Sequence, residues 1–283
     1  MKDELKNIRD DLGQLKTEGR NLNTLHIDKM STLEMMTVMN NENRVVEDAI
    51  ATQLSPIAEA VDIIAAALEA GGHLIYIGAG TSGRLGVVDA SECPPTFGVD
   101  SRLVRGIIAG GEGAMFKAVE GAEDDEYRGA AELLQDGVVA GDVVVGLSAS
   151  GGAPYVLGAL KKAKEIGAIP IGITCNPNSR MHPLCVITIA PYVGPEVITG
   201  SSRLKAGTAQ KLVLNMISTG VMIKTGKVVG NLMVNVRPTN AKLRDRCIRI
   251  LMELGGCDRD IATALIDQYG DIRKSLTVLE NKN

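Results

Sequence analysis

The sequence predicts an α/β protein: a doubly wound, five-stranded parallel sheet with helices before it and a small helical bundle after it. Three observations support this fold class. Short runs rich in β-branched residues alternate with helix-like segments between residues 73 and 191, which is typical of a parallel sheet covered on both faces. Two of the strand ends carry matching turns with glycine and hydroxyl side chains. Beyond residue 239 the pattern changes to three short helices punctuated by glycine.

Helical periodicity dominates the first 70 residues. Leucine and isoleucine recur every three or four positions within residues 1–20, which predicts an amphipathic helix. A second helix is expected to begin at Ser31 or Thr32, because a hydroxyl N-cap is followed there by Glu34 in the first turn. A third helix spans about Pro56–Ala70 and ends at two glycines.

Five short runs are the predicted strands: 73–78, 103–111, 142–148, 169–175 and 186–191. They are expected in the flavodoxin-like order 2-1-3-4-5, and a long helix follows them over about 205–224. We therefore divide the chain into an N-terminal helical segment (1–60), a sheet domain (61–230) and a three-helix bundle (238–283). The bundle vaguely resembles ubiquitin-associated domains and is interpreted as a structural cap.

The composition is that of an ordinary soluble globular protein. Of 283 residues, 45% are hydrophobic and 23% charged, with a net charge of −4. With two Phe, five Tyr, no Trp and no basic block, few side chains can stack bases, so nucleic acid is not an expected partner. The charged N-terminus lacks the apolar core of a signal peptide. Scattered cysteines and histidines predict reduced thiols in a cytoplasm, without a structural metal. The uncharged run 143–160 contains glycines, serines and a proline, so it is interpreted as a buried strand, a loop and a helix start, and no membrane is expected.

The strongest functional signal is a turn that occurs twice. The strings "IYIGAGTSG" (75–83) and "VVVGLSASG" (143–151) align so that each strand opens into a turn with two hydroxyls. Free N–H groups and the positive end of a helix dipole attract an anion there, and hydroxyls add neutral donors. Strands 1 and 3 are neighbours at the switch point, so the two turns should face each other across one crevice. The predicted phosphate-binding residues are Gly80, Thr81, Ser82, Ser148, Ser150 and Gly151.

Gly78, Gly80 and Gly83 also spell the dinucleotide-binding fingerprint G-x-G-x-x-G. That fingerprint needs an acidic residue at the end of the second strand, about 20 residues further on. Asp100 is near that distance but precedes the predicted strand, and Glu112 lies beyond it. The sequence therefore favours a phosphomonoester over a dinucleotide.

A third stretch, "EVITGSSRLKAGTAQK" (196–211), gathers hydroxyls and cations at the mouth of the long predicted helix. A capped helix with solvated charges explains this stretch when it is taken alone. Beside a phosphate site, Ser201, Ser202, Arg203 and Lys205 become further candidates for ligand contact.

Hydroxyl-bearing turns on a five-stranded sheet resemble the sugar isomerase (SIS) domain. Four longer strings are more specific: "IGAGTSGRLGVVDASECPPTFG", "AVEGAEDD", "TCNPNS" and "GSSRLKAGTAQKLVLNMISTGVMIKTGKVVGNLMV". They are similar to N-acetylmuramic acid 6-phosphate etherases, to which the glucokinase regulatory protein is related. The similarity runs from about Asn23 to Asn240. It implies a homodimeric enzyme that acts on a phosphorylated amino sugar and needs no metal and no other cofactor.

The resemblance also implies a reaction. The family hydrolyses the D-lactyl ether at C3 of N-acetylmuramic acid 6-phosphate to N-acetylglucosamine 6-phosphate and D-lactate, a step in reusing cell-wall sugar. A base removes the C2 proton of the open-chain aldehyde, an acid protonates the departing lactate oxygen, and water then adds. The family's two carboxyl residues correspond to Glu92 in "DASECPP", the acid, and Glu123 in "EGAED", the base.

The position of Glu92 leads to two expectations. It should close the helix that opens at Ser82, just before Pro94 and Pro95, and a helix C-terminus raises a carboxyl pKa, as an acid catalyst requires. Ten helical residues also span about 15 Å, too far for Glu92 to reach carbons beside a phosphate at Ser82. Either the helix is short and folds back, or the site is shared between subunits; a shared site is our hypothesis.

One departure leaves the preferred substrate open. The family usually has Arg-Thr after the Ser-Gly of the second turn, whereas this chain has Gly152-Ala153. Two alternatives to an etherase therefore remain. A non-catalytic sugar-phosphate sensor fits the altered turn, and an aldose–ketose isomerase also removes a C2 proton but needs no acid at C3.

Overall fold

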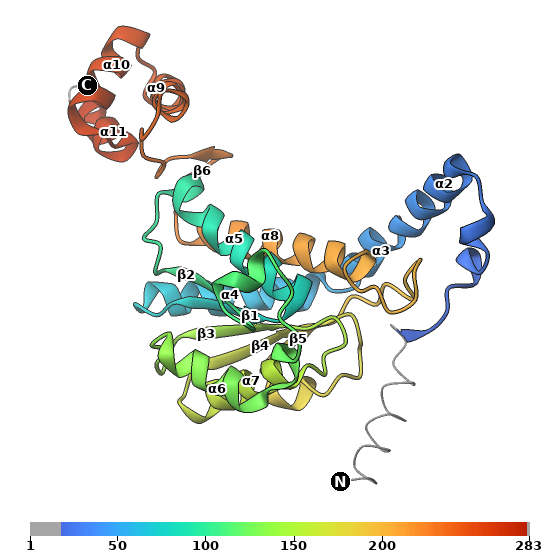
Figure 1. The fold of residues 1–283 in the computed structure, drawn as a ribbon. Helices are drawn as coiled ribbons and strands as arrows, with labels where there is room; N and C mark the ends of the chain where they lie inside the picture. Colours follow the sequence, from blue (N-terminus) through green and yellow to red (C-terminus); the bar gives the residue numbers. More distant parts are fainter. Residues whose placement is uncertain (1–17, 282–283) are drawn as a thin grey trace.

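A computed structural model describes residues 18–281 of the chain, so the predicted helix within the first twenty residues lies almost entirely outside them. The centre of the molecule is a parallel sheet with strand order β2-β1-β3-β4-β5 (Figure 1). The strands are β1 (Leu74–Gly78), β2 (Val104–Ile108), β3 (Val143–Leu147), β4 (Ile169–Ile173) and β5 (Ile187–Ile189). The predicted fold class and strand order are confirmed. β1 and β3 are neighbours, with Gly78 opposite Leu147.

Each predicted strand contains an observed one, but the observed strands are shorter. The run 103–111 overshoots most, because β2 ends at Ile108. Gly110 and Gly111 have φ angles of +91° and +74°, and this left-handed conformation cannot continue an extended strand.

Helices cover both faces of the sheet (Figure 1). On one face lie α4 (Leu54–Glu69), α5 (Gly80–Phe97) and α8 (Lys205–Lys224), and on the other lie α6 (Glu126–Gln135) and α7 (Pro154–Glu165). Each face packs its own apolar core. β1 and β3 are buried along their whole length, which explains their continuous apolar runs.

Short elements precede α4: η2 (Leu22–Thr24), η3 (Ile27–Lys29), α2 (Thr32–Asn43) and α3 (Val45–Ala51). The start of α2 confirms Ser31 as N-cap. Its hydroxyl accepts from the Glu34 N–H while the Glu34 carboxylate accepts from the Ser31 N–H, a reciprocal capping box. α3 packs on α8, whereas α2 has no fully buried residue and projects away from the sheet (Figure 1).

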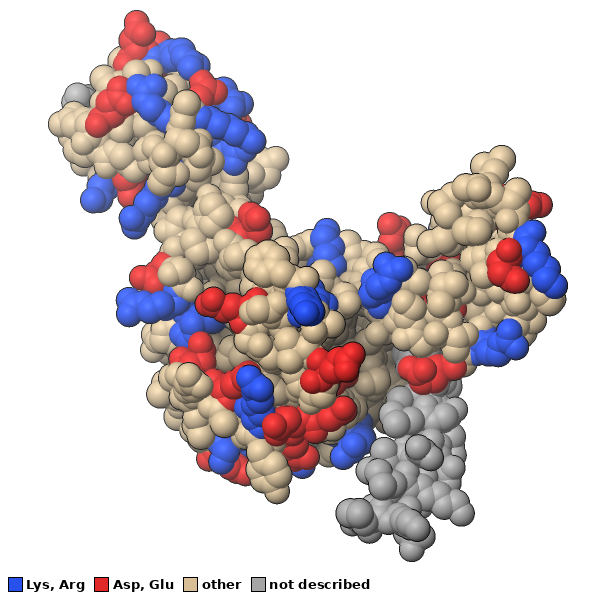
Figure 2. All heavy atoms as spheres, in the orientation of Figure 1, with Lys and Arg blue, Asp and Glu red and all other residues tan. Residues whose placement is uncertain are grey.

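The predicted C-terminal bundle consists of α9 (Ala241–Gly255), α10 (Arg259–Tyr269) and α11 (Ile272–Glu280), with a core of its own. Side chains of Asn240, Asp258 and Asp271 cap the three N-termini. A hairpin of β6 (Val228–Val229) and β7 (Leu232–Met233) lies between α8 and the bundle. On the face shown in Figure 2, acidic and basic side chains intermix over the bundle.

The division of the chain at residues 61 and 238 stays a prediction; α4 begins before residue 61 and packs against α8. Within residues 18–281, no single helix has the length and apolar character to cross a membrane. The segments Thr32–Ala51 and Leu54–Glu69 meet those two criteria only as a pair, and they are bent by 60° where they join.

Candidate functional site

The first hydroxyl turn lies where β1 passes into α5. Ala79, the N-cap residue, has no side chain that can cap the helix, so the first N–H groups of α5 point forward without an intrahelical acceptor. A Cβ on Gly83 would lie 2.6 Å from the carbonyl oxygen of Gly78. These glycines therefore allow the strand and the helix to approach closely, which explains the fingerprint without a dinucleotide. Thr81 and Ser82 follow in the first turn of α5.

The second hydroxyl turn follows β3 and is held rigidly. The Ser148 hydroxyl accepts from the Gly151 N–H at 3.1 Å and lies 3.3 Å from the Ser150 hydroxyl. Gly151 has a φ of +67°, and a Cβ there would lie 2.2 Å from the Cβ of Ser179. Only glycine fits this conformation and this space. Gly151 thus shapes the turn, whereas the two serines present the hydroxyls.

The two turns line one cavity of about 360 Å³, at the carboxyl ends of β1 and β3. Its walls are formed by Glu18, Ala79, Gly80, Thr81, Ser82, Glu123, Leu147, Ser148, Ala149, Ser150, Ala153, Gly200 and Ser202. Five of the six predicted phosphate-binding residues, all except Gly151, thus meet here with the further candidate Ser202 and the predicted base Glu123. Since hydroxyls, free N–H groups and a carboxylate face the same space, the cavity can bind an anion and move a proton.

The start of α8 contributes less to the cavity than its sequence indicates. Ser202 lines the cavity, but Ser201, Arg203 and Lys205 are not among its lining residues. A carboxylate of the protein already occupies this helix N-terminus, because buried Glu196 accepts from the N–H groups of the first two residues of α8 at 3.0 and 2.9 Å.

Lys205, a candidate for ligand contact, forms an ion pair within the protein. Its Nζ lies 2.7 Å from the Oε2 of Glu42, and its side chain is 3% exposed. The ammonium group is therefore neutralised within the fold, and the structure does not bring it to the hydroxyl turns.

Glu123 belongs to η5 (Ala122–Asp124), in the connection between β2 and α6 that also contains η4 (Glu112–Met115). η5 packs against α7, and Arg84 donates to the Met115 carbonyl at 3.2 Å, which ties this connection to α5. The Glu123 side chain is exposed at the wall of the cavity. Desolvation by the surrounding protein raises the pKa of its carboxyl, and the adjacent charge of Asp124 raises it further. A carboxylate with a raised pKa is a better base near neutral pH than a solvated one.

Glu92 lies outside the cavity, exposed on α5. The helix does not end there, as the sequence predicted: Pro94 and Pro95 lie within α5, which ends at Gly98 with a φ of +63°. The Asn235 amide donates to the Gly98 carbonyl at 3.3 Å, so a distant segment stabilises this terminus. The prediction of a helix end at Glu92 is therefore wrong, and the pKa argument built on that end does not hold.

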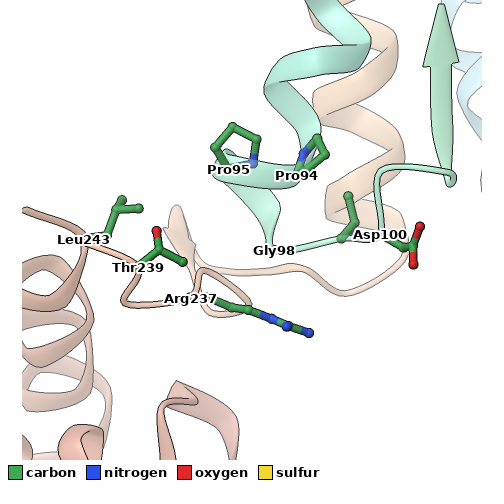
Figure 3. Close-up of a pocket in the computed structure, with 8 residues that line it drawn as sticks. Pro94, Pro95, Gly98, Asp100, Arg237, Thr239 and Leu243 are labelled. Carbon is green, nitrogen blue, oxygen red and sulfur yellow. The ribbon is translucent and has the colours of Figure 1, made fainter.

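A second cavity, of about 450 Å³, lies at the C-terminal end of α5, away from the hydroxyl turns. Figure 3 shows Pro94, Pro95 and Gly98 at the end of α5 on one side of this cavity, and Arg237 and Thr239, in the segment that leads into the bundle, on the other. Neither hydroxyl turn contributes to it. Glu92 lies two residues before Pro94 and lines neither of the two cavities.

The sequence did not predict two polar residues that lie at the site. Glu18 lines the cavity, with its Oε2 3.1 Å from where a Cβ on Gly200 would lie. Gln210 accepts a hydrogen bond from the Ser82 hydroxyl at 2.8 Å. Glu18 stands in a generally charged segment and Gln210 inside a helix, so neither differs in sequence from an ordinary surface residue. Across residues 18–281, no group of three or more His, Cys, Asp or Glu side chains is placed to hold a metal ion.

Two family models match the chain: the glucokinase regulatory protein N-terminal SIS domain over residues 56–164, and the SIS domain over residues 116–219. Solved structures with a similar fold include two phosphoheptose isomerases. The one from Francisella tularensis has a TM-score of 0.53 and 16% identity and covers 69% of this chain and 100% of that chain. The one from Neisseria gonorrhoeae has a TM-score of 0.51 and 18% identity, with coverages of 68% and 98%. Identities this low show the fold alone.

Curated relatives are far more similar. An N-acetylmuramic acid 6-phosphate etherase of Pectobacterium atrosepticum is 57% identical over 269 residues, which is 95% of this chain and 89% of the relative. An etherase of the same name from Clostridium beijerinckii is 53% identical over 272 residues, with coverages of 96% and 90%. Identity at this level over nearly the whole of both proteins, in a chain whose fold is that of an SIS domain, shows that it belongs to the N-acetylmuramic acid 6-phosphate etherase family.

Proposed function

We propose that this protein cleaves the D-lactyl ether at C3 of N-acetylmuramic acid 6-phosphate, releasing N-acetylglucosamine 6-phosphate and D-lactate in the reuse of cell-wall sugar. One observation carries this proposal: two hydroxyl turns and Glu123 line the same cavity. A phosphate bound at the turns leaves the sugar extending toward the carboxylate. The high identity to etherases supports the choice of substrate.

The phosphate is proposed to bind at Gly80, Thr81, Ser82, Ser148 and Ser150, with Ser202 across the cavity. Free N–H groups at the start of α5 and neutral hydroxyls supply donors to its terminal oxygens. Glu18 can only accept hydrogen bonds when ionised, so its carboxylate suits sugar hydroxyls and not phosphate oxygens. Binding energy from the phosphate is thereby available to hold the reacting carbons near Glu123.

In the proposed reaction, Glu123 takes the C2 proton of the open-chain sugar, which the neighbouring aldehyde acidifies. The electron pair left at C2 forms the C2–C3 double bond as the C3–O bond to lactate breaks. Glu92 donates a proton to the departing lactate oxygen. Water then adds across the double bond, with its oxygen bonding to C3 and its proton to C2, which completes a net hydrolysis.

We further propose that two subunits share each site. Twelve helical rises separate Gly80 from Glu92, a distance of about 18 Å, so Glu92 does not serve the cavity of its own chain but a neighbour's. Exposed apolar surface supports a homodimer. Leu33 and Met36 on α2 are 78% and 48% exposed, and an apolar groove of about 660 Å³ lies between α3, α4 and α8.

We also propose a cytoplasmic location. The five cysteines are free thiols, and a reducing compartment keeps thiols in this form.

The deciding experiment incubates the protein with N-acetylmuramic acid 6-phosphate and follows D-lactate, with Glu123→Gln as the matched inactive control. Release of D-lactate by the wild-type protein and not by Glu123→Gln supports the etherase function. Tight binding of the substrate without release of D-lactate would instead indicate a sugar-phosphate sensor. Formation of a ketose from another sugar phosphate would indicate an isomerase.

A further inference from the structure

We propose that Gln210 is a positioning residue, which moves the Ser82 hydroxyl from a partner inside the protein to the bound phosphate. This inference rests on the proposed phosphate site and adds the residue that controls it. The Oγ of Ser82 lies 2.8 Å from the Oε1 of Gln210. This contact joins the first turn of α5 to the second turn of α8, and Ser82 and Gln210 are only 9% and 1% exposed.

The other end of the Gln210 amide is unusual. Its Nε2 is buried and has no hydrogen-bond partner among the described residues. Buried amide groups in folded proteins nearly always find partners, because an unpaired one loses its hydrogen bonds to water without replacement. Gln210 does not itself line the cavity, but its amide contacts Ser82, which does, so the unpaired group belongs to a side chain directly behind the proposed phosphate site.

The observed arrangement cannot itself bind phosphate through Ser82. A serine hydroxyl has one proton, and here that proton goes to Gln210 Oε1. Phosphate oxygens need donors, so the proton has to be released. Half a turn of the amide about its last side-chain bond exchanges the nearly isosteric Oε1 and Nε2. Nε2 then donates to the Ser82 oxygen, and the hydroxyl proton is free to point into the cavity.

A bound phosphate interacts differently with the two arrangements, since only the turned amide gives it the Ser82 proton, and it therefore selects the turned arrangement. Ser82 needs a partner that can both accept and donate, which describes an amide but neither a thioether nor a carboxylate.

The test measures dissociation constants by calorimetry for N-acetylglucosamine 6-phosphate and inorganic phosphate. Gln210→Met keeps the side-chain length without hydrogen bonding. We expect it to weaken binding about three- to tenfold, and to weaken it no further in a Ser82→Ala background. Ser218→Ala is the control, because this buried hydroxyl on the same helix bonds Asp89 of α5 and not the site. The Ser218→Ala protein should bind both ligands with the affinity of the wild-type protein.

A second variant separates positioning from packing. Gln210→Glu supplies a carboxyl that, when ionised, only accepts, holds the Ser82 proton and repels phosphate; when protonated, it can donate again. The ratio of its dissociation constant to the wild-type value should therefore fall as pH falls, whereas the ratio for Gln210→Met should stay flat.

Three outcomes overturn the inference. One is unchanged affinity in Gln210→Met, and another is losses that add fully with Ser82→Ala. The third is a pH-independent ratio for Gln210→Glu, which marks a packing role. Failure of the wild-type protein to bind any sugar phosphate overturns the proposed site and this inference with it.

Discussion

Lys205 and Glu42 form a buried ion pair that anchors the N-terminal segment to the start of α8. Their Nζ and Oε2 atoms are 2.7 Å apart, and the two side chains are 3% and 11% exposed. The same carboxylate accepts hydrogen bonds from Asn21 and Asn23 at 2.6 and 2.8 Å. Although burial opposes ionisation, hydrogen bonds from Asn23, Lys205 and Asn21 and the charge of Lys205 lower the pKa of Glu42. The pair therefore serves stability.

Replacing Lys205 by Met should destabilise the fold strongly, because it leaves the Glu42 carboxylate buried without its cation. A loss of about 3–5 kcal/mol in the free energy of unfolding is expected, measured by urea denaturation. The double change Lys205→Met with Glu42→Leu should recover most of that loss. The exposed pair of Lys224 and Asp62 is the control, since Lys224→Met should cost only about 0–1 kcal/mol. Equal losses at the two lysines would contradict the structural role.

The second hydroxyl turn should fail if Gly151 gains a methyl group. Gly151→Ala combines a positive φ with a Cβ 2.2 Å from the Cβ of Ser179, so the turn has to move. We expect a loss of about 1–3 kcal/mol and a loss of sugar-phosphate affinity in the protein that remains folded. The matched control is Gly113→Ala, where a Cβ meets no atom within 4 Å. Thermal unfolding measures the stability of both variants, and calorimetry measures their affinity for a sugar phosphate. If Gly151→Ala keeps wild-type stability and affinity, the second hydroxyl turn is not part of the binding site.

Whether a feature of the fold or site could be predicted from the sequence depends on how far apart in the sequence the interacting residues lie. Ser31 as N-cap and the start of α8 at Lys205 follow from local sequence, since caps and periodicity act within a few residues. The glycines of the two turns could also be predicted, because strand-to-helix turns need glycine at fixed spacing. By contrast, the hydrogen bond from Asn235 to Gly98 at the end of α5 joins residues 137 positions apart. The ion pair of Lys205 spans 163 residues, so no local pattern predicts it.

The pH dependence of the reaction should report the raised pKa of Glu123. A base works only when ionised, so kcat/KM should fall as pH falls through that pKa, at a higher pH than for an ordinary glutamate. Asp124→Asn removes one cause of the upward shift, and the acid limb should therefore move to lower pH. Asp260→Asn, which removes the same charge in the bundle, is the control and should leave the profile in place. An unmoved limb in Asp124→Asn would show that another group titrates.

The altered second turn has room for the residue that the family usually has. A Cβ on Gly152 would meet only the Ser150 hydroxyl, at 3.7 Å. Gly152→Arg adds a cation beside the proposed phosphate site and should lower KM for the doubly anionic substrate about tenfold, the effect of one charge-assisted hydrogen bond. Gly152→Gln, of similar length without the charge, should have little effect. If both substitutions act alike, charge at this position does not control substrate affinity.

Complementation between two inactive variants tests the shared site. Glu92→Ala and Glu123→Ala should each abolish D-lactate release in homodimers, because each removes one of the two proton-transfer groups. In a mixed dimer, one cavity combines the intact Glu123 of one subunit with the intact Glu92 of the other, while the second cavity has neither. Denaturing and refolding equal amounts of the two variants should then restore about a quarter of wild-type activity, since half the dimers are mixed and each has one working site. Tagging the variants differently and purifying the mixed dimer should raise this to about half. A purified mixed dimer without activity would show that each subunit contains its own complete site.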